Sequence, residues 1–306
     1  MYAKFNGHNV MFAAIATQAY RESWARTLVS GRTAVHDVCA ATPPLRAFVL
    51  AESPHAQQLH KVCPEVFTAT PKVLCKLCGV KAVTPSTGVA VEVALPSPAP
   101  SAAAMLRRQG AHVLVLDGIS NPGNVGTLVR TASAFGWSGV ITLPGTVDLF
   151  NDKAIRSSKA SCFTMPHFEA PSWHDLGVAL RDGDDDDRGG CINTVFVAEA
   201  SRLGDDRLRS SSVSNSSKHK GATVLVLGNE SQGLSNDART ALAAAVATPS
   251  EERSTVRVVR ASIPMSEQAE SLNVGVAGSI LMHLLRDTAW EQQPHPSLVD
   301  FSDWLT

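Results

Sequence analysis

Four apolar runs in the second part of the chain are separated by segments with helical spacing, and this alternation restricts the fold more than any other feature. The runs are HVLVLDGI (112–119), GVITL (139–143), TVFVAEA (194–200) and TVLVLGN (223–229). Helical spacing occurs at 125–135, 151–162, 237–246 and 271–287. Strands that are apolar along their whole length are typical of a parallel sheet with helices on both faces. We therefore expect an α/β fold with a mostly parallel sheet.

The chain before this alternation has a different pattern and is expected to form a second, smaller α/β domain. Its segment GVAVEVALP (88–96) alternates in polarity, which predicts an edge strand. The Pro-, Ser- and Ala-rich stretch at 96–104 has the composition of a linker that packs poorly. The predicted divisions are an N-terminal extension (1–24), a first domain (25–97), a linker (98–110), a second domain (111–288) and a C-terminal tail (289–306).

Two polar insertions interrupt the second domain, at 181–190 and 204–221. Both lack the apolar residues that a core requires, so we expect surface loops. The first insertion contains the run DDDD, which we expect to be solvated rather than to bind a cation.

Composition places the chain among globular proteins, with 44% hydrophobic and 18% charged residues. The net charge of −1 conceals an asymmetry, because residues 1–110 hold 11 Lys and Arg against 5 Asp and Glu. A basic first part indicates either a polyanionic partner such as nucleic acid or a solvated surface that has no partner. The six scattered cysteines indicate a reduced, intracellular protein. The extension at 1–24 is either a mitochondrial targeting segment or an ordered helix.

Three polar loops lie next to the predicted strands and helices. They are SNPGNVG (120–126), LGNESQGLS (227–235) and IPMSEQAESLN (263–273). Ligands of parallel α/β sheets bind where strands end and helices begin, so the three loops are expected to form one composite pocket. None of them matches the phosphate-binding P-loop or the GxGxxG dinucleotide pattern.

The helical segments add three expectations. Arg130 points away from the apolar face of its helix, towards solvent, an anion or a partner subunit. The last helix is apolar almost all round and is expected to be buried. At its amino end, Ser271 and Asn273, the latter inside the first turn, are expected to meet polar groups of a ligand. The alternative is that Ser271 simply caps the helix.

The three loops with their flanking residues resemble the three signature motifs of the SpoU/TrmH family of RNA ribose 2′-O-methyltransferases, within the SPOUT superfamily. The matching segments are NPGNVGTLVRTASAFGWSGV, LVLGNESQGLS and IPMSEQAESLNVGVAG. Asn121, where the family often has an acidic residue, and Ser266-Glu267-Gln268, where it usually has a Gly, are departures. The first domain resembles the small ribosomal-protein-like RNA-binding domain of many members, through GRTAVHDVCAATPPLRAFVLAE and TPSTGVAVEVALP.

The resemblance implies a knotted (trefoil) domain with S-adenosylmethionine as cofactor, no metal, an RNA substrate and a homodimer. Ribosomal RNA is the first choice of substrate and transfer RNA the second. The positions that match functional residues of the motifs are Asn124, Arg130, Glu230, Ser271 and Asn273. The positions expected to contact the cofactor are Leu227, Gly228, Asn229, Gly233, Ile263, Met265 and Leu272.

The implied reaction assigns each motif residue a task. A guanidinium stays protonated in proteins, so we expect Arg130 to bind a substrate phosphate and stabilise the developing alkoxide. Direct removal of the hydroxyl proton by Arg130 is the alternative. Glu230 is expected to organise its loop or to orient Arg130. Asn124, Ser271 and Asn273 are expected to hold the ribose and the loops by hydrogen bonds.

Three interpretations of the function are open at the level of sequence. The chain is either an active methyltransferase, a catalytically silent relative that binds RNA, or a nucleotide-binding α/β enzyme of another class. A zinc site made by His60, Cys63, Cys75 and Cys78 has suitable ligands, although the two cysteines of CKLC fall in a helical pattern where buried thiols are common.

Overall fold

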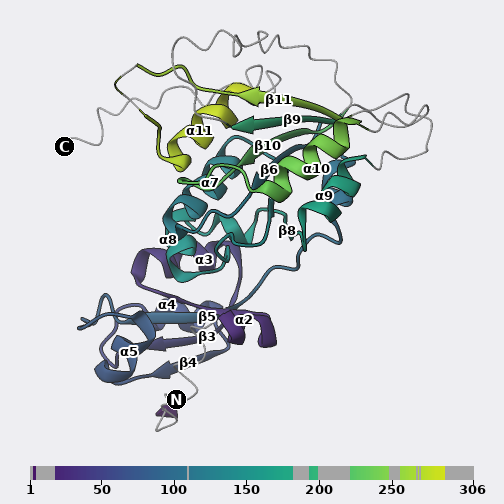
Figure 1. Cartoon of the computed structure of the whole chain (residues 1–306). Coiled ribbons are helices and arrows are strands. Elements are labelled where there is room, and N and C mark those ends of the chain that lie inside the picture. Colours follow the sequence, from purple (N-terminus) through teal and green to yellow (C-terminus); the bar gives the residue numbers. More distant parts are fainter. Residues whose placement is uncertain are drawn as a thin grey trace, which may run out of the picture.

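The computed structural model describes residues 3–4, 18–108, 110–181, 193–198, 221–247, 256–266, 268 and 270–286. The described residues form two sheets with helices on both faces of each (Figure 1). A six-stranded sheet occupies the upper part of the view and a five-stranded sheet the lower part.

The six-stranded sheet is parallel throughout and has the order β11-β9-β10-β6-β7-β8. Its strands are β6 (His112–Leu116), β7 (Gly139–Thr142), β8 (His167–Glu169), β9 (Asn193–Ala198), β10 (Thr223–Leu227) and β11 (Val256–Ala261). The four apolar runs correspond to β6, β7, β9 and β10, which confirms the predicted α/β fold with a mostly parallel sheet. The sequence pattern missed β8 and β11.

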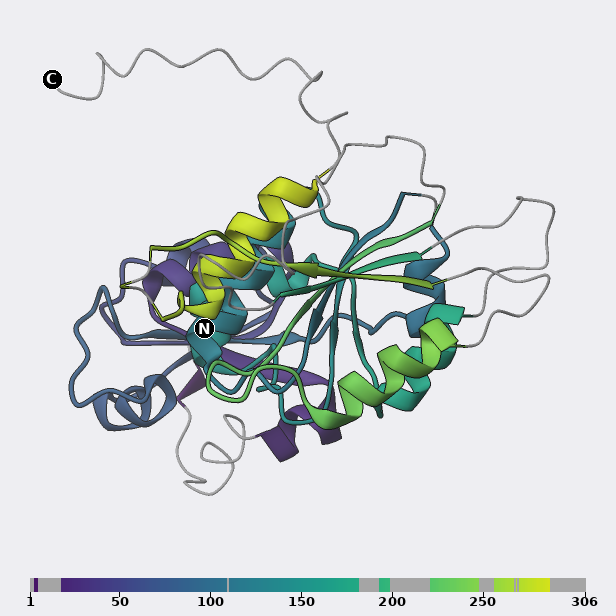
Figure 2. The same cartoon turned by 45° about the horizontal axis from the view of Figure 1, so that its top comes forward.

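Helices cover both faces of this sheet because the strand residues alternate between two cores. Leu114 and Leu116 of β6 pack with α7 (Pro122–Ala134), α8 (Asp152–Ser158), the 3-10 helix η1 (Ser161–Phe163) and α11 (Val274–Leu285). Val113 and Val115 pack with α6 (Ala102–Leu106), α9 (Trp173–Arg181) and α10 (Asn236–Ala247) on the other face. Figures 1 and 2 show the two groups of helices on opposite sides of the strands.

The five-stranded sheet is mixed and has the order β1-β4-β3-β5-β2. Its strands are β1 (Ala3–Lys4), β2 (Arg26–Ser30), β3 (Pro44–Val49), β4 (Glu65–Thr68) and β5 (Val89–Ala94). The helices of this part are α2 (Gln18–Trp24), α3 (Arg32–Ala41), α4 (Ala56–Val62) and α5 (Pro71–Cys78).

The predicted edge position of the strand at 88–96 is wrong, because β5 lies between β2 and β3. The polar residue that created the alternating pattern is Glu92, whose side chain is completely buried. Its carboxylate lies 3.7 Å from Arg26 and 3.6 Å from Arg46 on the neighbouring strands. Two cations therefore balance a carboxylate that the sequence pattern places at a solvated edge.

The predicted linker also differs from expectation. Ser101 caps α6 by accepting a hydrogen bond from Ala104 N, and Ala102, Met105 and Leu106 are buried in the core under α9. Within this stretch, α6 is therefore packed against the second sheet rather than loosely held.

One continuous core joins the two parts of the chain. It contains Val35 and Val38 of α3 together with Phe150, Ile155 and Phe163 from the other part. Two ion pairs cross the same boundary: Arg21 to Asp148 at 2.6 Å, and Asp37 to Lys159 at 3.6 Å. Apolar packing and charge pairing together fix the small sheet against the large one.

The last helix is only partly buried, which corrects the expectation from its composition. Leu281 and Met282 are buried, but Val276, Ile280 and Leu284 are 50%, 37% and 60% exposed. Residues four apart share a face of a helix, so α11 carries an exposed apolar stripe.

Several predictions fall on undescribed parts of the chain. They concern most of the extension (1–24), nearly all of both insertions (181–190 and 204–221) and the tail (289–306). Among the helices that the structure describes, none combines the length and the apolar character needed to cross a membrane.

Replacing Arg21 by Ala is expected to lower the free energy of unfolding by about 2 kcal/mol, because a hydrogen-bonded charge pair that is mostly shielded from water is lost. Arg156→Ala is the matched control, since Arg156 pairs with Asp152 on the surface of α8 and should matter by less than about 0.5 kcal/mol. Urea unfolding followed by tryptophan fluorescence measures both. Equal losses in the two variants would show that the Arg21 pair does not hold the two parts together.

Candidate functional site

The three polar loops meet at one edge of the large sheet. The strands β6 and β10 are neighbours, so the loops that follow them leave the sheet side by side. The segment after β11 runs to α11, which packs against α7 and β10. A cavity of about 570 Å³ lies between the loop at 228–234, the end of β11 and the start of α11.

All seven residues predicted to contact a cofactor line this cavity. They are Leu227, Gly228, Asn229, Gly233, Ile263, Met265 and Leu272. Two of the residues matched to functional positions, Glu230 and Ser271, line it as well. Residues more than 40 positions apart in the chain therefore share one site.

Gly228 lines the cavity and lies close to the backbone of Gly233. A Cβ atom on Gly228 would lie 2.5 Å from the carbonyl carbon and oxygen of Gly233, and backbone cannot move aside as a side chain can. Gly233 has a φ of +68°, which favours glycine. Asn229 and Gly233 exchange two backbone hydrogen bonds of 2.9 Å, so the loop closes on itself.

A hydrogen-bonded chain connects all three loops. The Asn124 side-chain amide donates to Glu230 Oε1 at 2.6 Å, and Asn273 Nδ2 donates to Asn124 Oδ1 at 3.2 Å. The direction of the chain is fixed at both ends. Glu230 can only accept when ionised, and Asn273 Oδ1 already accepts from Gly275 N and Val276 N. Asn124 must therefore turn its NH₂ group to Glu230 and its oxygen to Asn273.

Asn273 is the N-cap of α11, and the alternative that Ser271 simply caps this helix is wrong. The helix begins at Val274, so Asn273 stands just before its first turn rather than inside it. One side chain thus satisfies free N–H groups of the helix and also holds Asn124. Ser271 is exposed and lines the cavity.

Arg130 lies on α7 about 9 Å along the axis from Asn124, at 1.5 Å per residue. Its side chain is exposed and faces away from the sheet, as predicted, and it does not line the cavity. Within the described residues, it makes no hydrogen bond or ion pair. Glu230 contacts Asn124 and not Arg130, so of the two roles expected for Glu230 the contact agrees with organising the loop and not with orienting Arg130.

The sequence analysis did not select Arg239 and Arg260, which also line the cavity. Arg239 is on α10 and Arg260 is on β11. The β-branched run VRVVRA at 256–261 is the signal that could have indicated a strand that carries Arg260.

Asp117 is a second residue that was not selected. Its carboxylate is 4% exposed and accepts hydrogen bonds from Trp173 Nε1 at 2.9 Å and Ser235 N at 2.8 Å. The Asp117 N–H donates to Leu227 O, and Asn229 Nδ2 donates to Gly118 O. Asp117 therefore ties the end of β6 to the loop that forms the cavity wall. A carboxylate that directly follows an apolar strand was the available signal.

The cysteines of the small sheet do not form a shared cluster. Cys75 and Cys78 are on α5, whereas Cys63 follows α4 and donates its thiol to Glu65 O. Burial raises the pKa of Cys63 and of Cys78, which disfavours the thiolate that binds zinc. No group of three or more potential ligands for a metal occurs among the residues that are described.

Residues 111–283 match the sequence model of the SpoU rRNA Methylase family. The chain belongs to this family. Among its relatives is the 23S rRNA (guanosine(2553)-2′-O)-methyltransferase RlmP of Bacillus subtilis, 30% identical over 176 residues, which are 57% of each chain. Another is the 23S rRNA (adenosine(1067)-2′-O)-methyltransferase of Streptomyces laurentii, 32% identical over 58% of this chain and 55% of that protein. The chain spans just over half the length of these curated relatives.

Solved structures of SpoU proteins share the fold over most of the chain. The SpoU methyltransferase AviRb from Streptomyces viridochromogenes, in complex with the cofactor AdoMet, covers 90% of this chain and 96% of its own with a TM-score of 0.63 at 23% identity. The AdoMet-bound rRNA methyltransferase from Sinorhizobium meliloti gives a TM-score of 0.62 at 20% identity, over 92% of this chain and 95% of that chain. At such identities the likeness establishes the α/β fold and nothing more.

Asp117→Asn is expected to loosen the cavity wall, because an amide has one acceptor oxygen where the carboxylate has two. Either Trp173 Nε1 or Ser235 N would then face an NH₂ group, at a cost of about 1–3 kcal/mol in the free energy of unfolding. Amide hydrogen exchange should accelerate over residues 229–235. Asp237→Asn, an exposed change in the first turn of α10, is the control. If exchange in the two variants were the same, Asp117 would have no role in holding the loop.

Proposed function

We propose that the protein transfers the methyl group of S-adenosylmethionine to a ribose 2′-hydroxyl of RNA, with ribosomal RNA as the first choice of substrate and transfer RNA as the second. The observation that carries the proposal is the single site in which the three family motifs meet. Glu230 and Ser271 line its cavity, and Asn124 and Asn273 join them through the Asn273–Asn124–Glu230 chain. The named activities of the curated relatives support the same reaction.

The cavity fits S-adenosylmethionine in size and chemistry. A volume of about 570 Å³ is within the range of about 300–1,000 Å³ for small-molecule sites. Leu227, Ile263 and Leu272 supply an apolar surface suited to a base. Glu230 and the cations Arg239 and Arg260 supply charges of both signs for a zwitterionic amino-acid group. When bound, the cofactor supplies an electrophilic methyl group on a positively charged sulfur.

The residues of the chain position the ribose and stabilise charge. The Asn273–Asn124–Glu230 chain holds the three loops in register, which addresses the alignment that methyl transfer demands. Arg130 has no anionic partner in the described part of the chain, so its guanidinium is available to a substrate phosphate and to the developing alkoxide. A phosphate oxygen or water then accepts the proton, because the guanidinium is already protonated.

We also propose a division of the chain into domains. Residues 25–97 form the RNA substrate-binding domain, 98–110 the connection and 111–288 the methyltransferase domain. The basic charge of the first part and its tight packing against the second support this assignment. Rigid docking presents bound RNA to the cavity in a fixed orientation. We propose that the reaction takes place inside the cell. That residues 1–24 are a mitochondrial targeting segment stays a prediction.

Two finer features belong to the proposal. The first is a trefoil knot. It is supported by the path of the chain, which passes through β11 at the edge of the sheet, beyond β9, and then returns to α11, where α11 packs against α7. The second is a homodimer through the exposed stripe of Val276, Ile280 and Leu284. Contiguous exposed apolar surface of this kind is typical of protein interfaces. Because α7 packs beside α11, such a dimer would bring Arg130 near the subunit boundary.

The reaction is tested with the full chain, methyl-labelled S-adenosylmethionine and RNA separated by size. A 2′-O-methyl group prevents alkaline cleavage of the adjacent phosphodiester, so label is expected in alkali-resistant dinucleotides of the ribosomal fraction. Label in mononucleotides would show base methylation and overturn the proposal. Cofactor binding without any transfer would favour a silent RNA-binding relative.

In the same assay, Arg130→Ala is expected to reduce methyl transfer by about a thousandfold, the scale of a lost charge-stabilising donor. The affinity for S-adenosylmethionine, measured by calorimetry, should remain within about twofold, because Arg130 does not line the cavity. Arg156→Ala on α8 is the control for removing an exposed cation. Loss of cofactor binding in the Arg130 variant would refute its assignment to the substrate side.

Leu284→Glu is expected to convert the proposed dimer into a monomer of 32.4 kDa, because a carboxylate replaces an apolar side chain of the contact. Size-exclusion chromatography with light scattering gives the mass. Val178→Glu on α9 introduces the same charge at a partly exposed valine away from the stripe and should leave the dimer intact. A wild-type mass of one chain, or a dimer that survives in the Leu284 variant, would contradict this interface.

A further inference from the structure

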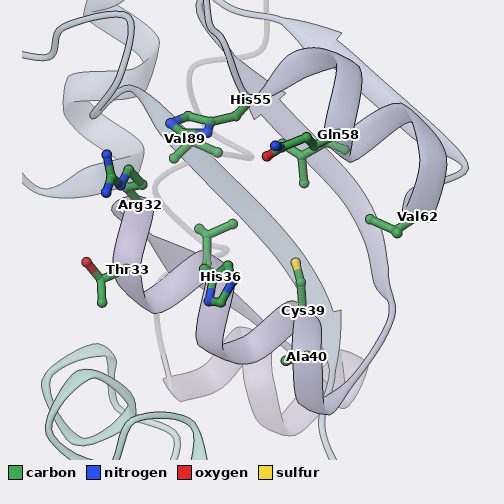
Figure 3. Close-up of a pocket in the computed structure, with 11 residues that line it drawn as sticks. Arg32, Thr33, His36, Cys39, Ala40, His55, Gln58, Val62 and Val89 are labelled. Atoms are coloured by element: carbon green, nitrogen blue, oxygen red, sulfur yellow. The ribbon is translucent and has the colours of Figure 1, made fainter. Parts of the chain in front are cut away.

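A second cavity, of about 630 Å³, lies in the small sheet's part of the chain, between α3 and α4 (Figure 3). It contains none of the residues assigned above to methyl transfer. Nothing in the proposed reaction uses it, and its volume matches that of a small-molecule site.

The floor of this cavity is apolar. Val35 of α3, Leu59 of α4 and Val89 of β5 are at most 6% exposed and face it. Cys39 points its Sγ atom into the space, and burial raises the pKa of this thiol to about 11, so it stays uncharged. At the open side, Val62 is 53% exposed. A ligand must therefore present flat or rounded apolar surface to the floor.

The rim of the cavity is polar and carries no carboxylate. Arg32 and His55 stand at one end, with His36 and Gln58 along the sides (Figure 3). The His55 ring is held by a contact of 3.0 Å between its Nε2 and Ser86 O. Arg32 makes no hydrogen bond or ion pair with any described residue. The rim thus offers a free cation and several hydrogen-bonding groups to a ligand.

The charges around the cavity favour an anion. Residues 25–97 hold seven Lys and Arg against four Asp and Glu. Three of the four acidic groups already lie beside cations: Asp37 by Lys159, Glu65 by Arg46, and Glu92 between two arginines. The negative charge of this part is therefore largely neutralised within the protein. The positive charge of Arg32 has no such partner among the described residues.

We propose that this cavity binds one unpaired nucleotide of the RNA substrate, with its base on the Val35–Leu59–Val89 floor and its phosphate against Arg32. An unpaired base has apolar faces, hydrogen-bonding edges and an adjoining anion, which are the three features that the floor and rim require. Imidazole rings such as those of His36 and His55 also stack on bases. This inference rests on the proposed function, since it takes RNA as the substrate.

One RNA can contact this cavity and the methyl-transfer site together. The helix α3 packs on η1, η1 packs on α7 and α8, and α7 packs on α11. All these helices share one hydrophobic core, and they lie on the same side of the molecule in Figures 1 and 2. An extruded nucleotide held between α3 and α4 would therefore fix which neighbouring ribose reaches the loops after β6 and β10.

The test compares Val62→Glu with Val80→Glu in the full chain. Both valines are exposed on the surface of the same part of the protein, but only Val62 lines the cavity. The probes are a hairpin RNA with several unpaired loop nucleotides and a blunt duplex of the same stem. Fluorescence anisotropy should show that Val62→Glu weakens hairpin binding about tenfold or more, the scale of one lost base contact. Its affinity for the duplex, and the hairpin affinity of Val80→Glu, should change less than about twofold.

A second measurement locates the nucleotide directly. Photo-crosslinking of the hairpin carrying 4-thiouridine in its loop should label the tryptic peptides 33–46 and 47–61, which contain α3 and α4. Arg32→Gln should reduce hairpin affinity, whereas Lys81→Gln, which removes an exposed cation outside the cavity, should not.

The outcomes separate this inference from the proposed function. If the wild-type protein methylates RNA but Val62→Glu and Val80→Glu bind the hairpin equally, the cavity inference is wrong and the reaction stands. Equal weakening for hairpin and duplex would also overturn it, since backbone alone would then be recognised. A wild-type protein that neither methylates nor binds RNA would refute both. Unchanged affinity for S-adenosylmethionine shows that each variant is folded.

Discussion

The candidate site depends on the hydrogen bonds that the buried carboxylate of Asp117 accepts. This carboxylate stands where β6 ends and accepts hydrogen bonds from Trp173 on α9 and from the backbone of Ser235 at the start of α10. Both donors are buried or partly buried, so the carboxylate cannot be exchanged for an apolar group without leaving them unpaired. Because β10 lies directly beside β6, this one group positions the loop that carries Gly228, Asn229 and Glu230.

From that anchor, the site extends by polar contacts between segments that lie far apart in the chain. Asn273 caps α11 and holds Asn124 at the start of α7, which in turn holds Glu230. The Asn273 side chain satisfies N–H groups of its own helix and also binds a distant side chain, and the Asn124 side chain contacts two other loops. Such double use makes the arrangement sensitive, since a change at one position releases groups in two elements.

Much of the fold was predictable because strands that are buried on both faces of a sheet are apolar along their whole length. Four of the six strands of the large sheet were visible as apolar runs, and the helices between them as periodic patterns. β11 was missed because Arg257 and Arg260 interrupt its apolar character, and β5 was misplaced at an edge because Glu92 made a central strand look half exposed. In both cases a charged residue within the strand made the sequence pattern look unlike that of a buried strand. The charge of Glu92 is balanced by cations on the adjacent strands. Which strands are adjacent cannot be read from the sequence of one strand.

The sequence by itself determined which residue types follow each strand, that Arg130 faces away from the sheet, and that the chain carries the three SpoU motifs. Only the tertiary structure decided that Asn273 and not Ser271 caps the last helix, that Glu230 contacts Asn124 rather than Arg130, and that α11 keeps an apolar stripe exposed. The physical reason is that periodicity records how much of each residue is buried, whereas a hydrogen bond depends on which strands are neighbours. Strand order places residues 106 and 149 positions apart within contact, and nothing local in the chain encodes that choice.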